Sequence, residues 1–443
     1  MRSKDGTLCV VGAGYVGLTT AVGLVGSGYR VDVYERDPVR AEKLRGGEPP
    51  VEEPGIRPLL RDALMDGRLR VIRSLAETVA QIVFVCVATP IDDAGQSDLG
   101  QVRAALAELA ASARHEPTIV VRSTLPLGVG QRLAAEGSLD PRRSFTNPEF
   151  LRQGSALADF LRPSRVVIGR FPQSDGGRLQ ALLAVFDGID APRFVVDVTA
   201  SELIKNAANA FLALRLSFVN ELALLAEECG CDIGAVLPAI AADPRIGSAY
   251  LQPGFGFGGS CLPKELRTLT LAGWERNLPM NVTAAASAAN AVHRERFAIR
   301  LERLLGGLRD RRIGLLGLAF KAGTDDVRES PALWLAARML EAGAEVCGYD
   351  PLAGPNAKRA LPELQIASTI DEALSGADAA VIATEWPELR AYDWSRAPHL
   401  LRTPLVVDGR RLLDPTVLRR SGLRYVAVGS PNDCAGDGLP DGT

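Results

Sequence analysis

Histidine is scarce in this sequence: His115, His293 and His399 are the only three among 443 residues. None of them stands in a segment with other catalytic residue types. The sequence therefore disfavours two interpretations. One is an enzyme that relies on a histidine base, and the other is a protein with a histidine-rich metal site. We expect no bound metal.

Cysteine is also sparse, and its odd number, seven, argues against a disulfide framework in a chain of this length. Cys229 and Cys231 form a CxC pair, with no second cluster of cysteine or histidine to complete a metal site. We interpret the pair as core packing at the end of a helix.

An excess of positive charge is absent too, since the formal net charge is -3. That net charge gives no sign of a positively charged surface that could bind nucleic acid or an anionic membrane, so we expect neither as a partner. The apolar run near the start, LCVV, is too short for a secretory segment or a membrane span, and no later run resembles one. These absences predict a cytosolic protein.

The sequence does contain an internal repeat. The segments LCVVGAG, YRVDVYE and IVFVCVATP near the start correspond to RRIGLLGLAF, AEVCGYD and AAVIATEWP near the end. Each set indicates a strand, a helix, a strand ending in Tyr and an acidic residue, and another buried strand. Continuous apolar runs suit parallel strands covered on both faces. The sequence therefore predicts an α/β fold with two doubly wound, Rossmann-like domains.

Between the two halves, residues 199–229 contain neither Pro nor Gly and place apolar side chains at helical spacing. The spacing predicts one connecting helix, roughly 42 Å long at 1.5 Å per residue. We expect Ser201 to cap its start and Gly230 to stop it. Such a helix has apolar surface left for a second subunit, so we expect a homodimer. The Gly/Asp/Pro-rich end, 431–443, is expected to be disordered.

A glycine-rich turn follows the first strand, where Gly12, Gly14 and Gly17 form GxGxxG. This spacing permits a tight turn, close approach of a pyrophosphate to the backbone and close packing of the next helix. GxGxxG alone is a weak signal, because a purely structural turn has the same spacing. Glu35, at the end of the second strand, strengthens it: a carboxylate there binds ribose hydroxyls and favours NAD over NADP, although Arg36 opposes it.

The most informative segment is GFGFGGSCLPKE, residues 254–265. Its glycines let a ligand approach the backbone, and Cys261 stands where a helix would begin. The amides and dipole at a helix N-terminus lower the pKa of a thiol. A buried structural cysteine is the alternative, but the neighbouring glycines favour a nucleophile in a binding loop.

Lys205 and Asn209 are four residues apart in the predicted long helix, so they share a face and could both point at one substrate atom. A polar stripe facing water is the alternative. The apolar residues Phe211 and Leu214 nearby indicate burial, where a lysine needs a partner. Glu149 follows Pro148 in a turn, and by itself it indicates no more than a surface charge or a cap.

Taken together, these segments resemble the UDP-glucose/GDP-mannose dehydrogenase family. In family order, the resemblance is carried by GAGYVGL, CVATP, STLPLGV, NPEFLRQGSALADF, SELIKNAANAFLALRLSFVNE, YLQPGFGFGGSCLPKE, GLAFKAGTDDVRESPA and VVDGR. It implies four-electron oxidation of a nucleotide sugar at C6, UDP-glucose to UDP-glucuronate, with NAD as cofactor. A cysteine thiohemiacetal and then a thioester are the implied intermediates, and no metal is needed.

The resemblance also implies a domain division. It places an N-terminal NAD-binding Rossmann domain at 1–198 and a small helical dimerisation domain, built around the long helix, at 199–300. A nucleotide-sugar-binding, Rossmann-like domain follows at 301–430.

Carried over residue by residue, the resemblance makes Cys261 the nucleophile, and it makes Lys205 and Asn209 the groups that stabilise oxyanions at C6. Glu149 matches a carboxylate assigned to thioester hydrolysis, and Thr124 matches a threonine that helps to hold the catalytic water. Expected cofactor contacts are Gly12, Gly14, Tyr15, Val16, Gly17, Glu35, Thr89, Pro90 and Thr124. Expected substrate contacts are Glu149, Phe150, Leu151, Lys205, Asn209, Arg245, Tyr250, Gly254, Phe257, Gly258, Lys321 and Arg410.

One further position supports this match, and two depart from it. Arg245 resembles an arginine that reaches into the neighbouring subunit's substrate site, which supports the expected dimer. Glu265 stands where the family usually has Asp, four residues after the cysteine; a carboxylate remains, so we keep it among the catalytic residues. Gln153 stands where the family tends to have Glu, so any charge role there is lost.

Several alternatives stay open at this point. The same chemistry could act on dTDP-glucose, GDP-mannose or another UDP-hexose. A two-electron dehydrogenase of the hydroxy-acid type would explain the glycine-rich turn but would leave Cys261 without a purpose. A non-catalytic nucleotide-sugar-binding protein would have no need of the thiol. These readings predict two, one and no NADH per sugar, respectively.

Overall fold

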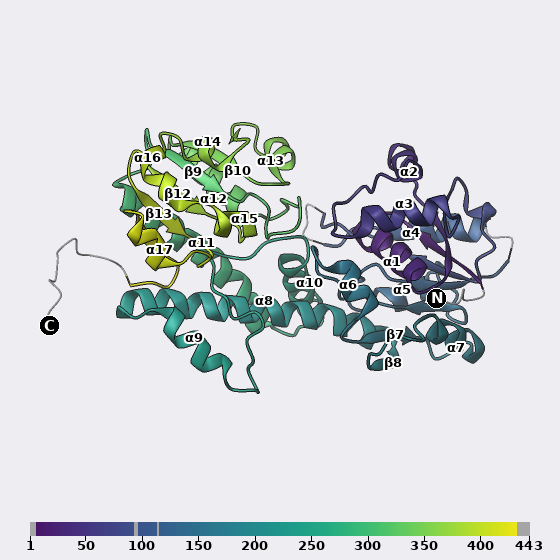
Figure 1. Ribbon diagram of the computed structural model, residues 1–443. Helices are drawn as coiled ribbons and strands as arrows, with labels where there is room; N and C mark the ends of the chain where they lie inside the picture. Colours follow the sequence, from purple (N-terminus) through teal and green to yellow (C-terminus); the bar gives the residue numbers. More distant parts are fainter. Residues whose placement is uncertain (1–5, 93–95, 113–114, 432–443) are drawn as a thin grey trace. The chain divides into compact units, whose positions relative to one another are not determined.

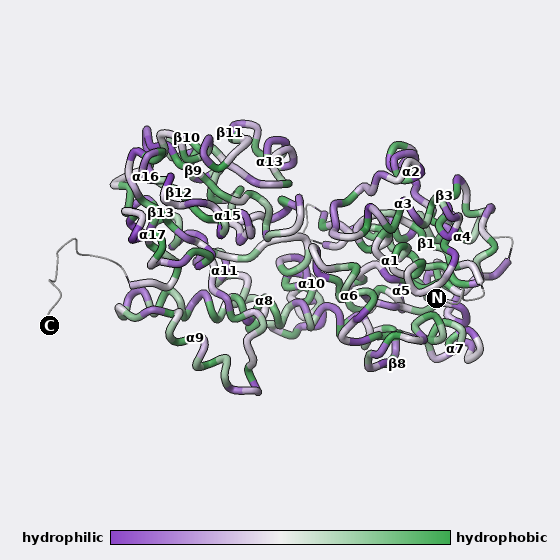
Figure 2. Tube along the Cα trace, viewed as in Figure 1, coloured by the Kyte–Doolittle hydropathy of each residue, from purple (hydrophilic) through white to green (hydrophobic). Residues whose placement is uncertain are grey.

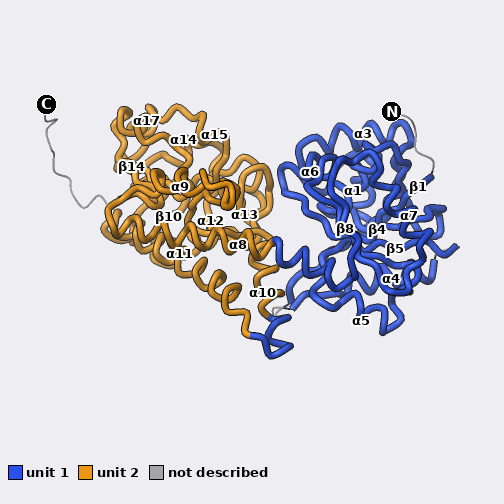
Figure 3. Tube along the Cα trace, turned by 90° about the horizontal axis from the view of Figure 1, so that it is seen from below, with its two compact units in different colours: residues 1–208, 271–278 blue, residues 209–270, 279–443 orange. Residues whose placement is uncertain are grey.

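The structure, a computed structural model, describes residues 6–92, 96–112 and 115–431 (Figure 1). The chain divides into two compact units, which Figure 3 colours separately. Unit 1 comprises Met1–Ala208 and Leu271–Leu278, and unit 2 comprises Asn209–Thr270 and Pro279–Thr443. Of the segment expected to be disordered, 431–443, all but Pro431 lies outside the described residues.

A largely parallel sheet forms the centre of unit 1 (Figure 1). Its strands are β1 (Thr7–Val11), β2 (Arg30–Tyr34), β3 (Leu69–Ile72), β4 (Ile82–Val85), β5 (Thr118–Val121), β6 (Ser144–Thr146), β7 (Val166–Arg170) and β8 (Arg193–Asp197). Among the described residues they take the order β3-β2-β1-β4-β5-β6-β7-β8, and β6 and β7 alone pair antiparallel. The inner strands β4 and β5 are buried throughout, as expected where helices cover both faces.

The helices of unit 1 lie between these strands in the chain. They are α1 (Tyr15–Gly26), α2 (Pro38–Arg45), α3 (Ile56–Met65), α4 (Gly100–Ser112), α5 (Val129–Ala135), α6 (Ala156–Leu161) and α7 (Gly176–Val185), with a 3-10 turn at Leu75–Glu77. The strand order reverses beside β1, whose neighbours are β2 and β4. Such a reversal leaves a crevice at the carboxyl ends of the strands, where ligands bind in this class of fold.

Unit 2 repeats this architecture with a wholly parallel sheet. Its strands are β9 (Arg312–Leu316), β10 (Glu345–Tyr349), β11 (Gln365–Ile366), β12 (Ala379–Ile382), β13 (Leu405–Asp408) and β14 (Arg424–Ala427). Within the described part of unit 2 the order is β11-β10-β9-β12-β13-β14, which reverses beside β9. In Figure 2 the strands of both sheets are drawn largely in green, the colour of hydrophobic residues. The two predicted doubly wound sheets are confirmed.

The remaining helices begin with the long helix α8 (Val198–Cys229), which joins the two units. The others are α9 (Ile233–Ala241), α10 (Leu262–Trp274), α11 (Asn281–Leu305), α12 (Pro331–Glu341), α13 (Gly354–Ala360), α14 (Ile370–Leu374), α15 (Pro387–Ala391), α16 (Ala397–Leu400) and α17 (Pro415–Arg420), with a 3-10 turn at Trp394–Arg396. Because α8 is divided between the units at Ala208, the division into three domains stays a prediction.

The predicted capping residue of α8, Ser201, is wrong by four positions, although the helix begins only one residue before the predicted 199. The helix begins at Val198, and the Asp197 carboxylate accepts a hydrogen bond from the Ala200 N–H at 2.9 Å. Asp197 is therefore the capping side chain, whereas Ser201 lies inside the helix and accepts from the Thr146 hydroxyl at 2.9 Å. The predicted end is confirmed, because α8 stops at Cys229 and Gly230 takes φ 71°.

By length and composition α8 would also fit a membrane span, which the sequence analysis did not anticipate. Three polar side chains show that one face of it is buried in protein instead. Glu202, Lys205 and Asn206 are all buried, and each is hydrogen-bonded to protein atoms. A core helix of a protein shows this pattern, since buried polar groups need partners.

The interpretation of Cys229 and Cys231 as core packing is wrong. The pair does lie at a helix end, but both side chains are exposed. Apolar residues of α8 further from its end, such as Ala223 and Ala226, fill the core instead.

The internal repeat holds for the strands and extends to the turns after β1 and β9, where the N–H groups of Gly12 and Gly317 donate to the Tyr34 and Tyr349 carbonyl oxygens. After β9, the N–H groups of Leu318 and Ala319 donate to Oδ2 of Asp350 at 2.7 and 3.0 Å. The indole N–H of Trp386 donates to the same oxygen at 3.0 Å, and Asp350 is buried. The acid after β10 thus binds amides of the turn after β9, as Glu35, the acid after β2, binds the Ala13 N–H in the turn after β1.

Candidate functional site

The residues predicted for the site are divided between the two units. The expected cofactor contacts, together with Glu149, Phe150, Leu151 and Lys205, belong to unit 1. Cys261, Asn209, Glu265 and the other expected substrate contacts belong to unit 2.

The glycine-rich turn after β1 has the geometry that its spacing predicts. Gly12 takes φ 92°, a left-handed conformation that favours glycine. A Cβ on Gly17 would lie 1.8 Å from the Gly12 carbonyl oxygen, so the close packing of α1 needs glycine there. A Cβ on Gly14 would meet nothing within 4 Å. The space beside Gly14 is therefore open to a ligand at the N-terminus of α1, where no side chain caps the helix.

Glu35 follows β2 directly and lies at this turn. Its Oε2 accepts from the Ala13 N–H at 2.8 Å, and its Oε1 accepts from the Asp37 N–H at 3.0 Å. The carboxylate is thereby held beside the phosphate-binding turn, where ribose hydroxyls of a dinucleotide would reach it. The residues present fit NAD: an open glycine turn, an uncapped helix N-terminus and an acid after the second strand.

Two other predicted cofactor residues lie together. The Thr89 hydroxyl donates to the Thr124 carbonyl oxygen at 3.1 Å, which joins the ends of β4 and β5. The loop that carries Thr124 is held on α8 by Glu202. Its two carboxylate oxygens accept from the Gly128 and Gly130 N–H groups, each at 2.6 Å.

Glu149 and Lys205 form a buried ion pair. Lys205 Nζ lies 2.9 Å from Glu149 Oε1, and both side chains are less than a tenth exposed. Glu149 Oε2 accepts from the Leu151 N–H at 2.6 Å. Burial acts to raise the pKa of Glu149, but Lys205, the Leu151 N–H and Arg122 together hold that pKa below its ordinary value. Glu149 is thus an ionised carboxylate, which its sequence context did not indicate, and Lys205 is buried with a partner, as expected.

Phe150 lies near two cations: the Arg165 guanidinium is 3.7 Å from the centre of its ring, and Lys205 Nζ is 5.5 Å from it. Beside Lys205 lies a cavity of about 10 Å³, close to the volume that one water molecule needs. It is lined by Val121, Ser123, Leu125, Thr146, Pro148, Ser201, Glu202 and Lys205.

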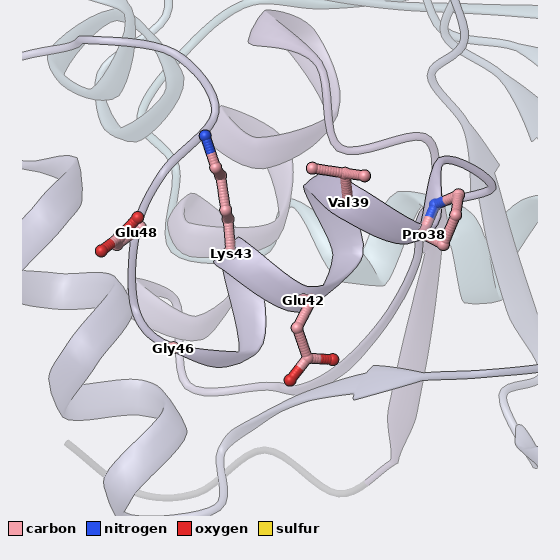
Figure 4. A pocket seen from close by; sticks show the side chains of 6 residues that line it. All are labelled: Pro38, Val39, Glu42, Lys43, Gly46 and Glu48. Atoms are coloured by element: carbon pink, nitrogen blue, oxygen red, sulfur yellow. The ribbon is translucent and has the colours of Figure 1, made fainter.

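A larger surface pocket, of about 540 Å³, lies on α2 (Figure 4). Its lining comes from one short segment, in which the Val39 and Lys43 side chains point away from Glu42 (Figure 4). The lining residues are Pro38, Val39, Glu42, Lys43, Gly46 and Glu48. None of the residues predicted for the site lines this pocket, so it does not mark the site.

In unit 2, Cys261 directly precedes α10 and is exposed, as the sequence predicts for a nucleophile at a helix start. The Ser260 hydroxyl lies 3.7 Å from its sulfur. Arg328 is close enough to interact electrostatically with it. The pKa of Arg328 is raised mainly by its hydrogen bond to Asp326 and additionally by Cys261. A guanidinium near the sulfur favours its thiolate form.

The glycine-rich loop before Cys261 is held by polar side chains of α11 that the sequence analysis missed. Asn290 accepts from the Phe257 N–H and donates to the Phe257 carbonyl. His293 Nε2 lies 2.7 Å from the Gly254 carbonyl oxygen. Burial lowers the pKa of His293 to about 4, so its ring is neutral near pH 7. Asn290 and His293 are three residues apart in an otherwise apolar helix face. This spacing is the sequence feature from which their contact with the loop could have been predicted.

The same loop is fixed from two further sides. Asn220 of α8 accepts from the Gly254 N–H at 3.0 Å, and Arg410 donates to the Gly256 carbonyl oxygen at 3.1 Å. Glycine is required in this loop at Gly258, where a Cβ would lie 2.0 Å from the Glu329 carbonyl oxygen. The loop backbone is thus rigidly placed before the cysteine.

The other predicted residues of unit 2 are more dispersed. Arg245 is exposed and pairs with Asp243. Tyr250 takes φ 59°, which is uncommon for a residue with a side chain. Glu265 is buried in the first turn of α10, and Asn209 is half-buried on α8. Over residues 6–92, 96–112 and 115–431, no cluster of three or more His, Cys, Asp or Glu side chains could hold a metal ion.

Comparison with known proteins gives matches along nearly the whole chain. Residues 6–187 match the NAD binding domain of the UDP-glucose/GDP-mannose dehydrogenase family. Residues 199–292 match the central domain of that family, and residues 314–415 match its UDP binding domain.

Individual relatives are similar over nearly their full length. A UDP-glucose 6-dehydrogenase of Pseudomonas aeruginosa is 39% identical, over 96% of this chain and 97% of the relative. The solved structure of a UDP-glucose dehydrogenase from Pyrobaculum islandicum is 38% identical, with a TM-score of 0.87 over 97% of this chain and 98% of that one. A UDP-D-ManNAc dehydrogenase from Pyrococcus horikoshii is 26% identical, with a TM-score of 0.83 over 96% and 99% of the two chains.

Proposed function

This chain belongs to the UDP-glucose/GDP-mannose dehydrogenase family, and we propose that it oxidises UDP-glucose at C6 to UDP-glucuronate with NAD. The observation that carries this proposal is the exposed Cys261 thiol, at the start of α10 and after a rigid glycine loop. A dehydrogenase that stops at the aldehyde needs no thiol. UDP-glucose is the preferred substrate because the two relatives described above at 39% and 38% identity carry that name.

NAD, when bound at the glycine-rich turn, takes up one hydride in each of two oxidations. In the first, the C6 alcohol loses a proton and a hydride and becomes an aldehyde. Lys205 and Asn209 donate hydrogen bonds to the C6 oxygen as negative charge develops on it. Such donors accelerate the step because they are already oriented before charge appears.

The Cys261 thiolate then adds to the aldehyde carbon, and the oxygen gains a proton, which gives a thiohemiacetal. The second oxidation removes a proton and a hydride from this adduct and leaves a thioester on Cys261. Thioester hydrolysis consumes one water and releases the carboxylate and the free thiol. The products are one uronate and two NADH per sugar.

Carboxylate side chains activate the water. The ionised Glu149 carboxylate accepts a proton from it, and Thr124 helps to hold it. Glu265, four residues after the cysteine on α10, supplies a second carboxylate for proton transfer. The remaining residues expected to contact cofactor and substrate keep those roles as part of this proposal, with Arg245 acting on the neighbouring subunit's site.

We propose a homodimer that uses the exposed face of α8. Four large apolar side chains on this helix are two-fifths to three-fifths exposed and recur at intervals of eight, seven and seven residues: Leu203, Phe211, Phe218 and Leu225. Side chains at this spacing lie in one stripe along a helix, the pattern with which helices pair. Exposed apolar stripes of this kind mark protein contacts. We also propose a cytosolic location, because the described cysteines are free thiols.

The stoichiometry of NADH to sugar tests the function. Purified protein is given limiting UDP-glucose and excess NAD, and NADH absorbance is compared with the uronate released. We expect two NADH per UDP-glucose consumed. One NADH per sugar would indicate a two-electron dehydrogenase, and turnover of GDP-mannose or dTDP-glucose in place of UDP-glucose would reassign the substrate.

A further inference from the structure

A buried carboxylate outside the predicted set joins two loops of unit 1. Glu53 lies in the segment between α2 and α3 and is 6% exposed. Its Oε2 accepts from the Tyr15 hydroxyl at 2.8 Å and from the Gly154 N–H at 2.7 Å. Its Oε1 accepts from the Ala156 N–H at 2.7 Å. Three donors from two distant parts of the chain thus converge on one carboxylate.

The Tyr15 end of this bridge belongs to the dinucleotide turn. Tyr15 is the first residue of α1 and follows Gly14, beside which the space is open. Burial, and then the hydrogen bond to Glu53, raise the pKa of the Tyr15 hydroxyl, so it stays protonated and remains the donor. The hydroxyl is thereby fixed on Glu53.

The other end of the bridge holds the loop that carries Glu149. Ala156 begins α6, and the residue before it, Ser155, makes no capping hydrogen bond with its side chain. The Glu53 carboxylate takes that place and caps the helix from outside. Seven residues before Ala156 in the same loop is Glu149, which is paired with Lys205.

We infer that Glu53 is a positioning residue that couples the dinucleotide turn to the loop of Glu149. A ligand that orders the turn around Tyr15 also orders residues 149–156 through the carboxylate. The assignment of the loop to the sugar side rests on the proposed function, whereas the coupling itself rests on the three hydrogen bonds.

Hydrogen–deuterium exchange with and without NADH tests the coupling, because it needs the cofactor alone. In the wild type we expect NADH to slow exchange across 149–156 by about tenfold, the factor that 1.4 kcal/mol represents. Tyr15→Phe removes the bridge at the turn and leaves the Glu53 cap on Gly154 and Ala156. In this variant NADH should still slow exchange at the turn but no longer at 149–156.

Tyr29→Phe is the matched control, since its hydroxyl donates to the Ala184 carbonyl oxygen elsewhere in unit 1. It should keep the wild-type response. Glu53→Gln retains the size of the side chain but puts an NH2 group against one of the donors, so it should also lose the response. If a folded Tyr15→Phe variant keeps the response, or if NADH never protects 149–156 in the wild type, the coupling is refuted. A protein that shows the coupling but does not oxidise UDP-glucose would refute the proposed function alone.

Steady-state kinetics give a second readout that a purely structural role would not move. Tyr15→Phe changes the cofactor side of the bridge, yet it should raise the KM for UDP-glucose about tenfold, by the same energetic factor. Glu53→Gln removes the same bond to Tyr15 and also disturbs the bonds to Gly154 and Ala156, so the double variant should show less than the sum of the two single effects. Additive effects of the two substitutions would contradict the bridge.

Discussion

Lys205 Nζ lies 2.9 Å from Glu149 Oε1, and both side chains are buried. Buried ion pairs are rarely retained for stability alone, since well-packed apolar residues stabilise a core at least as well. Here the pair keeps the Glu149 carboxylate ionised. The proposed uptake of a proton from water needs that state, and the proposed hydrogen bond to an oxyanion needs the lysine beside it.

Replacing Glu149 with Gln tests the hydrolytic step. Gln still accepts a hydrogen bond from Lys205 and cannot take up a proton from water. It also removes the counter-charge of a buried lysine and brings an NH2 group to the Leu151 N–H, so thermal unfolding must first show that the variant is folded. Uronate formation should fall by about 100-fold or more, and a covalent sugar adduct on the protein should persist. Intact-protein mass spectrometry under substrate and NAD measures the adduct. Glu52→Gln removes an exposed carboxylate paired with Arg57 and should behave as wild type; rapid turnover by Glu149→Gln without adduct would contradict the assigned role.

Glu35 should set the choice of cofactor. Its carboxylate would hydrogen-bond the ribose hydroxyls of NAD and repel the 2′-phosphate of NADP. Glu35→Gln should therefore reduce the ratio of kcat/KM for NAD to that for NADP by roughly tenfold, the worth of a charged hydrogen bond. Initial rates with each cofactor give the ratio. Equal use of both cofactors by the wild type would show that Arg36 offsets the acid.

Glu202 should make the stability of the protein depend on pH. Burial raises its pKa to about 7, despite the hydrogen bonds from Gly130 and Gly128 that favour the ionised form. A carboxyl with a raised folded pKa contributes stability that is present below its unfolded value, about 4.3, and lost as pH rises through about 7. The unfolding temperature of the wild type should fall between about pH 5 and pH 8 more than that of Glu202→Gln. Parallel pH curves for the two proteins would rule this out.

The apolar stripe of α8 predicts a defined change in assembly. A charge at Phe218, which is 53% exposed, should weaken self-association by roughly thirtyfold, the factor of about 2 kcal/mol lost at an aromatic contact. Light scattering across a dilution series of Phe218→Glu measures this. Val417→Glu, at a site 49% exposed on α17, is the control and should not change the mass. A wild type that is active as a monomer would contradict the proposed dimer.

Local patterns in the sequence were sufficient to predict the fold and the positions of the turns that contain candidate site residues. Parallel strands buried on both faces leave continuous apolar runs, so both sheets could be predicted. Gly12, Glu35 and Cys261 lie at strand or helix ends, whose positions follow from the same runs. The start of α8 was harder to predict, because Asp197 and Ser201 are both good capping residues and the sequence does not reveal which one strand β8 delivers to the helix end.

Contacts between segments that are distant in the chain could not be predicted from local patterns. Glu53 receives hydrogen bonds from residues 38 and about a hundred positions away, and its own segment contains only a short run of Pro and Glu. Glu149 likewise looked like a surface charge, because its partner Lys205 is 56 residues further along. Such partners are set by packing of the whole unit. Cys229 was misjudged for the same reason, since exposure at a helix end depends on what covers it.

The most direct test of the account is Cys261→Ala, assayed for uronate and for covalent adducts on the intact protein. Without the thiol neither the thiohemiacetal nor the thioester can form. We predict that uronate production falls by more than about 100-fold and that no adduct is detected, while binding of NAD and UDP-glucose stays near wild type. Cys261→Ser, which keeps a poorer nucleophile of similar size, should stall or accumulate an ester. Near-normal uronate production by Cys261→Ala would mean that the acid forms without a thioester, and the mechanism proposed for this protein would be wrong.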